Sequence, residues 1–211
     1  TNAIRDCYAH FSADKVEELY AEALVALADI SPISEFSIEE DFEDDSYEGN
    51  LKVIAGESAI VGSENNRYLD MTSTWNVLTS TQAAMNYKAN VDFKVADTDA
   101  VFFNFNMWNT EGSRANGYMI RLYPNGNSLN AQLYRGNGTE SDYTWIWTYA
   151  GTDVYYRGSN WHNLKILSYE GQMAIYLDNV LITPTSTSTD FTVKNGVVTD
   201  DTYKWGYFGF Q

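Results

Sequence analysis

The chain has 211 residues, 44% of them hydrophobic, which is enough for one packed domain with an appendage. Its 29 acidic residues against 13 basic ones give a formal charge of −16, which argues against nucleic acid or an anionic membrane surface as partner. No apolar run approaches the roughly 20 residues that cross a bilayer. The single cysteine, Cys7, excludes an internal disulfide, and two histidines leave no cluster of soft metal ligands.

The first predicted element is a helix that begins after Ser12. Apolar residues recur there at helical spacing, from Val16 to Leu27, and Ser12 is a suitable N-cap. Pro32 ends the pattern, and the composition then becomes acidic. We therefore predict an N-terminal helical segment over residues 1–35 and a second domain over residues 36–211.

From about residue 38 onwards, strand-length segments alternate with turn signals, which is typical of an all-β sandwich. The predicted strands cover residues 51–55, 68–72, 87–95, 100–108, 117–123, 129–135, 143–149, 163–169, 172–178 and 205–210. Asn125 and Gly126 can both adopt positive φ and are expected to close a tight hairpin. Gly171 marks a second hairpin of the same kind.

The segment over residues 100–135 carries the main functional signal. Alternate residues of a strand point to opposite faces, and one set here is apolar: Val101, Phe103, Phe105 and Met107, then Tyr118, Ile120 and Leu122, then Leu129, Ala131 and Leu133. If those residues face the core, the others form one polar and aromatic patch. Its predicted members are Asn104, Asn106, Trp108, Arg121, Tyr123, Asn130, Gln132 and Tyr134.

The segment over residues 143–149 places Tyr143, Trp145, Trp147 and Tyr149 on one side of a strand. On an outer face, Trp145 and Trp147 would form an exposed apolar patch that requires a ligand. In the core they would be packing residues. The sequence leaves both alternatives open, and the two tryptophans are candidate ligand-binding residues.

Amides, a guanidinium and flat rings match the surface of a sugar, which offers hydroxyl groups and C–H faces that stack on aromatic rings. In this hypothesis Arg121 binds adjacent hydroxyls or a sugar carboxylate, because its guanidinium donates in fork geometry. The alternative is that amides and tyrosines only solvate an exposed sheet and deter aggregation.

The stretches "GYMIRLYPNGNSLNAQLYRGN", "NWHNLKILSYEGQMAIYLDNVLI" and "WGYFGFQ" resemble the second half of a concanavalin A-like lectin and glucanase sandwich. The nearest types are laminin G-like and carbohydrate-binding modules and the related keto-glycoside hydrolase domains. The resemblance covers about residues 38–211. It implies an all-β, two-sheet antiparallel jelly roll, here with an N-terminal α-helical appendage, which binds glycan on its concave sheet.

The resemblance also implies a structural Ca²⁺ near the opening strand. Residues 35–48 contain eight acids and no base, and hard oxygen ligands at such density suit Ca²⁺. The candidate ligands are Asp41, Glu43 and Asp201. A solvated acidic linker is the alternative interpretation of the same residues.

Glucanases of this fold use carboxylates at Glu-x-Asp-x-Glu spacing, and Glu39, Asp41 and Glu43 satisfy it. This match lies in an acid-rich run, where chance fulfilment is easy. The main hypothesis is therefore a non-catalytic carbohydrate-binding module of a larger secreted or cell-surface bacterial protein, with a glycan as partner. A glycoside hydrolase of the same fold and an adhesion or interdomain structural module are the alternatives.

Overall fold

The computed structural model describes residues 37–71, 76–96, 99–108, 116–139, 141–151 and 160–211. Within them the chain forms strands only, apart from turns and bends and a single residue in 3₁₀ conformation. The strands are β1 (Leu51–Ala55), β2 (Ala59–Ser63), β3 (Asn66–Asp70), β4 (Val77–Ser80), β5 (Ala84–Met85), β6 (Tyr87–Phe93), β7 (Val101–Met107), β8 (Tyr118–Asn125), β9 (Ser128–Gly136), β10 (Tyr143–Tyr149), β11 (His162–Tyr169), β12 (Gln172–Leu177), β13 (Val180–Leu181), β14 (Ser186–Thr187), β15 (Thr192–Lys194), β16 (Val197–Thr199) and β17 (Trp205–Phe210).

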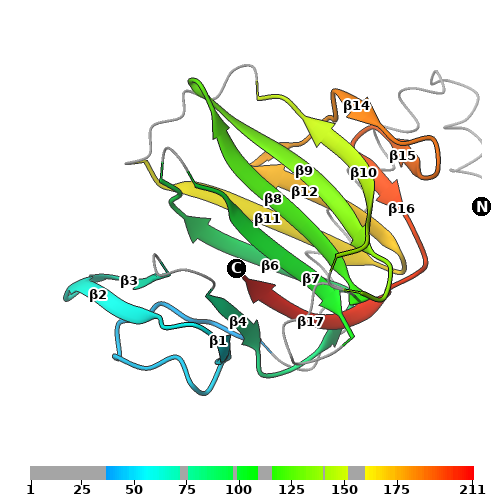
Figure 1. Cartoon of the computed structure of the whole chain (residues 1–211). Coiled ribbons are helices and arrows are strands. Elements are labelled where there is room, and N and C mark those ends of the chain that lie inside the picture. Colours follow the sequence, from blue (N-terminus) through cyan, green and yellow to red (C-terminus); the bar gives the residue numbers. More distant parts are fainter. Residues whose placement is uncertain (1–36, 72–75, 97–98, 109–115, 140, 152–159) are drawn as a thin grey trace, which may run out of the picture.

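Two antiparallel sheets make up the body of the molecule (Figure 1). The larger has nine strands in the order β1-β4-β17-β7-β8-β9-β10-β14, with β5 also paired to β17. The smaller has six strands in the order β15-β16-β12-β11-β6, with β13 paired to β12, and β2 and β3 form a separate hairpin. The C-terminal strand β17 is central, because it lies between β4 and β7.

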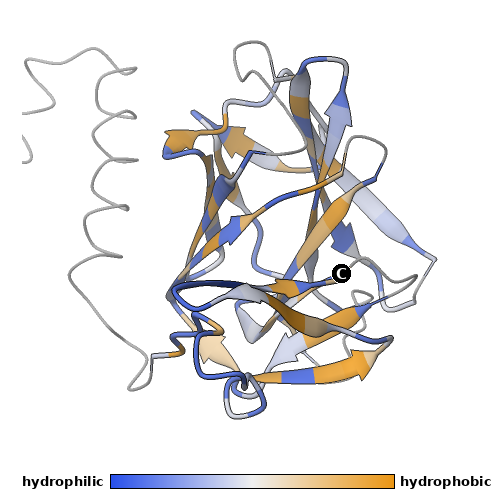
Figure 2. Ribbon diagram, turned by 90° about the vertical axis from the view of Figure 1, so that its left-hand side faces the viewer, coloured by the Kyte–Doolittle hydropathy of each residue, from blue (hydrophilic) through white to orange (hydrophobic). Residues whose placement is uncertain are grey.

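The two sheets pack face to face around one hydrophobic core (Figure 2). This core combines residues of the larger sheet, such as Phe103, Ile120 and Leu133, with residues of the smaller sheet, such as Ile166 and Ile175. The predicted inward set of β7, β8 and β9 is confirmed except at two positions: Val101 is only partly buried against this core, and Met107 is buried but lies outside it. Burying a side chain of this size contributes about 1.5–3 kcal/mol, so strand phase is strongly specified.

Two tight hairpins fix the register of the central strands. In the β8–β9 hairpin, Asn125 pairs with Ser128, and only Gly126 of the loop has positive φ. The expectation that Asn125 also adopts positive φ is wrong, because the two loop residues are Gly126 and Asn127. In the β11–β12 hairpin, Glu170 and Gly171 both have positive φ between the paired Tyr169 and Gln172.

The predicted helix after Ser12 lies in residues 1–36, outside the described residues, and the predicted domain boundary at residues 35 and 36 stays a prediction. Within the described ranges, no helix is long and apolar enough to cross a membrane.

Candidate functional site

The outer face of the nine-stranded sheet, which points away from the smaller sheet, carries the candidate site. Cross-strand pairing runs from Thr79 to Gly209, Asn104, Met119, Tyr134 and Trp145, across six strands from β4 to β10. A neighbouring row runs from Phe102 to Arg121, Gln132 and Thr148. Tyr123 pairs with Asn130 in a third row. Directly paired residues of an antiparallel sheet lie on the same face, so these side chains share one surface, here called the amide–tyrosine face.

Arg121 lies at the centre of this face. Its Nη1 donates to Oε1 of Gln132 at 3.4 Å, and its guanidinium lies 4.6 Å from the centre of the Tyr123 ring. Burial raises the pKa of the Tyr134 hydroxyl, and the nearby positive charge of Arg121 opposes that rise. Arg121 therefore lies among two tyrosines and an amide, with a planar cation stacked on one of the rings.

Two predicted members of the face already have partners within the protein. The Oδ1 atom of Asn130 accepts a hydrogen bond from the backbone N–H of Gly151 at 3.2 Å, and Asn130 is buried. The indole Nε1 of Trp145 donates to Oγ1 of Thr148 at 3.0 Å. Asn130 therefore anchors the end of β10, while the bond of Trp145 fixes its ring beside Tyr134 on the accessible face.

Asn104 is a buried polar residue with unmet hydrogen-bonding capacity. Its side chain is fully buried, and neither Nδ2 nor Oδ1 has a hydrogen-bond partner within the described part of the chain. Oγ1 of Thr79, which lies on the other side of Gly209 in the same row, is likewise buried without a partner. Each such group costs about 1–3 kcal/mol when desolvated. The row therefore holds polar groups that the described part of the fold leaves unsatisfied.

Asn106 does not belong to this face, which corrects the sequence prediction. The pairing of β17 with β7 shifts register between Tyr207 and Gly209, and Asn106 has a positive φ of 51°. This bulge turns the side chain inward, where Nδ2 donates to Oγ of Ser168 at 3.0 Å and to the carbonyl of Tyr203 at 2.9 Å. Ser168 belongs to β11, so Asn106 links the two sheets across the core.

Trp147 is also absent from this face. The pairing of β10 with β9 shifts register between Trp145 and Trp147, so Trp145 pairs with Tyr134 while Trp147 pairs with the inward residue Leu133. Trp147 is 1% exposed and belongs to the core. The expectation that the two tryptophans share one side is wrong, because an extra residue in β10 reverses the alternation.

Trp108 lies beyond the end of β7 and enters none of the cross-strand pairs. It is 47% exposed and packs against Tyr203, with ring centres 4.9 Å apart, and against Trp205 at 6.2 Å. Trp205 is itself 45% exposed. Trp108 therefore belongs to a separate aromatic pair at the end of the sheet.

The sequence analysis missed four residues that the structure places on the amide–tyrosine face: Thr79, Phe102, Met119 and Thr148. Phe102 and Met119 alternate with the inward residues, so their position follows from strand phase. Thr148 reaches the face only through the bulge in β10. Thr79 depends on β4, which the sequence analysis did not predict.

Charge is distributed very unevenly between this sheet and the rest of the chain. None of the residues in the nine strands is Asp or Glu, although the chain has 29 acidic residues. The basic residues of these strands are Lys52, Arg121 and Arg135. Lys52 lies in β1, four strands from Arg121, a separation of about 19 Å at the usual strand spacing.

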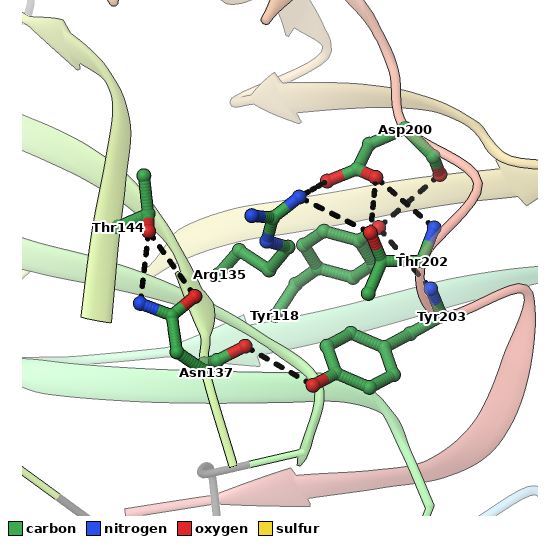
Figure 3. Close-up of polar contacts among 8 residues, drawn as sticks. Tyr118, Arg135, Asn137, Thr144, Asp200, Thr202 and Tyr203 are labelled. Carbon is green, nitrogen blue, oxygen red and sulfur yellow. Dashed lines mark hydrogen bonds and ion pairs between the residues drawn. The ribbon is translucent and has the colours of Figure 1, made fainter. Parts of the chain in front are cut away.

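Arg135 is turned to the other side of the sheet, where it takes part in a polar network behind the site (Figure 3). Its Nη1 lies 3.0 Å from Oδ2 of Asp200 and 3.1 Å from Oγ1 of Thr202. The hydroxyl of Tyr118 donates to the carbonyl of Asp200, and the hydroxyl of Tyr203 donates to the carbonyl of Gly136. Burial, reinforced by the negative charge of Asp200, raises the pKa of Tyr118 well above its usual range. This network ties the segment before β17 to β8 and β9.

The carboxylates at glucanase spacing do not lie on a strand. Glu39, Asp41 and Glu43 precede β1 in a segment of turns and bends, so alternation along a strand does not align them. Glu43 accepts hydrogen bonds from the backbone N–H groups of Asn65 and Arg67, at 2.7 and 2.8 Å. Glu43 therefore holds the β2–β3 hairpin against the opening segment.

The proposed calcium ligands are not brought together either. Oδ1 of Asp41 accepts from the backbone N–H of Glu43, and Oδ1 of Asp201 lies 3.2 Å from Nζ of Lys204. The described residues contain no group of three or more His, Cys, Asp or Glu side chains placed to hold a metal ion. These donors do not fit a calcium centre in this arrangement, and calcium binding stays a prediction from the sequence.

Similar solved structures share this sandwich at low sequence identity. A carbohydrate-binding module from Bacillus subtilis, CBM66, matches with a TM-score of 0.53 and 13% identity over 76% of this chain and 86% of that chain. A family 16 glycoside hydrolase endo-glucanase from Bacteroides ovatus matches with a TM-score of 0.56 and 12% identity, over 81% of this chain and 83% of that chain. A Bacillus subtilis protein of unknown function with a galectin-like fold matches with a TM-score of 0.50 and 10% identity, over 82% and 84%.

No protein-family model matches the chain, and no curated protein sequence gives a significant match. The fold is therefore what the structural similarity defines. The chain has the concanavalin A-like sandwich fold that the sequence resemblance predicted, of the type found in carbohydrate-binding modules, family 16 glucanases and galectin-like proteins.

Proposed function

We propose that this chain is a non-catalytic carbohydrate-binding module of a larger secreted or cell-surface protein, and that it binds glycan across the amide–tyrosine face. The observation that carries this proposal is the composition of the face: Arg121, Gln132, Tyr123, Tyr134 and Trp145 lie together on a sheet whose strands contain no carboxylate. Amides and a guanidinium bind hydroxyl groups, and flat rings stack on the C–H faces of sugars.

The number of groups is consistent with the affinity that such a module needs. A well-placed hydrogen bond contributes about 1 kcal/mol and an aromatic ring about 0.5–1.5 kcal/mol beyond its buried area. Three hydrogen bonds and two rings therefore supply about 4–6 kcal/mol, and millimolar affinity requires about 4 kcal/mol. Tyr134 and Trp145 are neighbours in adjacent strands, so both rings can contact one oligosaccharide.

The absence of carboxylates from the nine strands favours binding over hydrolysis. A retaining or inverting glycosidase requires two carboxyl groups on either side of the scissile bond. No strand residue of this sheet can supply either one. The comparisons support a glycan-related role in both cases, because the similar structures include a carbohydrate-binding module and an endo-glucanase.

A glycan panel read by microarray and calorimetry tests the proposal. We expect the folded chain to bind at least one plant, host or microbial glycan, without releasing reducing ends from it. Trp145→Ala removes a ring from the face and is expected to weaken binding about tenfold. Trp161→Ala is the matched control, because Trp161 is 46% exposed but packs on Tyr68, outside the amide–tyrosine face.

Three outcomes would contradict the proposal. Failure of the folded protein to bind any member of the panel would argue against glycan recognition. Release of product, abolished by Glu39→Gln or Glu43→Gln, would identify a hydrolase. Recognition of a protein partner that needs residues 1–35 and is unaffected by Trp145→Ala and Arg121→Ala would identify an adhesion or interdomain module.

A further inference from the structure

Arg121 has no acidic partner in the part of the chain that the structure describes. Within the described residues, its guanidinium hydrogen bonds to Gln132 and lies over the ring of Tyr123, and no carboxylate lies within ion-pair distance of it. Its Nε atom is buried and has no hydrogen-bond acceptor among the residues described. The guanidinium thus retains donor capacity that the fold does not use.

This arrangement is unfavourable for the folded protein alone. A cation partly withdrawn from water without a counter-charge loses hydration that its neighbours do not replace, and a buried N–H donor without an acceptor adds to that cost. Arg135, by contrast, has its counter-charge: it pairs with Asp200 at 3.0 Å. Among the described residues, an acidic partner therefore lies beside Arg135 and none lies beside Arg121.

We propose that Arg121 binds the carboxylate of an acidic sugar, so that the ligand class of the amide–tyrosine face is a uronic-acid-containing glycan. This inference rests on the proposed function and specifies its ligand. A carboxylate offers two oxygens in the plane of the guanidinium, which forms two parallel charge-assisted hydrogen bonds with it. The acid-free strands keep local repulsion low in a chain whose formal charge is −16.

The surrounding residues complete a recognition site for such a sugar. Gln132 holds one side of the guanidinium, and Tyr123 supports its plane from one face. Tyr134 and Trp145 follow in the adjacent strands with rings that can stack on a neighbouring sugar. Arg121 thereby binds the charged group of the ligand, and the two rings contact the rest of the oligosaccharide.

Calorimetric titration with matched oligosaccharides tests this inference. The probes are oligogalacturonate, oligomannuronate and oligoglucuronate, the methyl ester of each, a sulfated galactan oligosaccharide and a neutral β-glucan oligosaccharide of similar length. We expect at least one uronate to bind about tenfold or more tightly than its methyl ester, because a hydrogen bond to a charged group is worth more than one to a neutral group. Added salt should reduce that difference, since the ligand's charge is accessible to solvent.

Substitutions at position 121 show whether the guanidinium of Arg121 is responsible for the preference for the acid over its ester. Arg121→Gln should abolish the preference for the acid over its ester, and Arg121→Lys, which keeps the charge but loses the fork, should retain only part of it. Lys165→Gln is the matched control, since Lys165 also stacks on a tyrosine, at 4.4 Å from Tyr176, but belongs to the smaller sheet. Thermal unfolding of each variant reports whether it folds.

The outcomes separate this inference from the proposed function. Equal affinity for acid, ester and neutral oligosaccharide would overturn the inference while supporting glycan binding. Preference for the sulfated probe over every uronate would overturn the carboxylate assignment. A preference for the acid that survives in Arg121→Gln would show that another group reads the charge. Failure of every probe to bind would contradict both proposals.

Discussion

The two tryptophans of β10 provide the sharpest test of how this sheet divides its residues between core and face. Trp147 is 1% exposed and packs among core residues, whereas Trp145 lies on the accessible face and donates to Thr148. Replacing a fully buried aromatic residue by alanine costs about 3–5 kcal/mol, because the lost burial adds to the energy of the cavity that remains. Trp147→Ala should therefore lower the free energy of unfolding by about 3–5 kcal/mol, a large part of the stability of a typical domain.

Trp147→Phe provides a milder version of the same change. The indole Nε1 of Trp147 is buried without a hydrogen-bond partner in the described part of the chain, so phenylalanine removes an unsatisfied donor along with some volume. The two effects oppose each other, and the expected cost is about 1–2 kcal/mol. Trp145→Ala loses one hydrogen bond on a half-buried site and should cost about 1 kcal/mol.

Urea unfolding followed by far-UV circular dichroism measures the stability of the three variants. Calorimetric titration with an oligosaccharide that binds the wild type measures the affinity of each variant. We expect Trp147→Phe to bind normally and Trp145→Ala to bind about tenfold more weakly. Similar losses of stability in Trp145→Ala and Trp147→Ala would refute the division between core and face. So would normal binding by Trp145→Ala together with weakened binding by Trp147→Phe.

Three further predictions concern contacts away from the amide–tyrosine face. Asn106→Ala removes two buried hydrogen bonds and places alanine at positive φ, so it should lower the free energy of unfolding by about 3–5 kcal/mol. Asn106→Gly should cost about 1 kcal/mol less, because glycine adopts positive φ without strain. Equal stability of the wild type and both variants in urea would contradict this prediction. Tyr118 stays protonated in the folded state because its pKa is raised, while an unfolded tyrosine ionises at about pH 10. The contribution of Tyr118 to the free energy of unfolding is therefore complete below that pH and is lost as the pH rises above it. Tyr118→Phe should make the free energy of unfolding fall less steeply in alkaline denaturation profiles. Glu43→Gln weakens two hydrogen bonds from backbone amides and should lower the free energy of unfolding by about 1–2 kcal/mol, with or without calcium. A rise in melting temperature on adding calcium that disappears in this variant would instead identify Glu43 as a metal ligand.

Local sequence patterns were sufficient to predict the central strands. β10 and β17 begin and end where alternation and turn residues placed them, and β8 and β9 differ by one or two residues at their ends. These strands combine β-branched or aromatic residues with glycine-containing turns, so local preference and burial agree. The inward set of β7, β8 and β9 followed from the same alternation.

The sequence could not predict the two bulges, because each depends on contacts between distant segments. Asn106 turns inward where Gly206 of β17 approaches β7 closely, and it then bonds to Ser168 of the other sheet. The bulge between Trp145 and Trp147 is visible only against the register of β9. Asparagine tolerates positive φ better than most residues, which was the one local signal at Asn106. Simple alternation therefore placed both Asn106 and Trp147 on the wrong face.

The short strands were also beyond prediction from sequence. β4 has four residues and lies between β1 and β17, and β13 to β16 have two or three residues each. Segments of this length carry too little periodicity to distinguish them from loops. The position of Thr79 on the face consequently follows only from the pairing of β4 with β17.

The most direct test of the central claim is a side-chain NMR titration of the folded protein with an oligosaccharide that binds it. The claim is that glycan binds on the acid-free outer face of the nine-stranded sheet. We expect the guanidinium signal of Arg121, the side-chain amide of Gln132 and the indole N–H of Trp145 to shift, while the amide of Asn106 and the indole N–H of Trp147 stay in place. Shifts confined to the Trp108–Trp205 pair or to Trp161, with Arg121, Gln132 and Trp145 unchanged, would contradict the account.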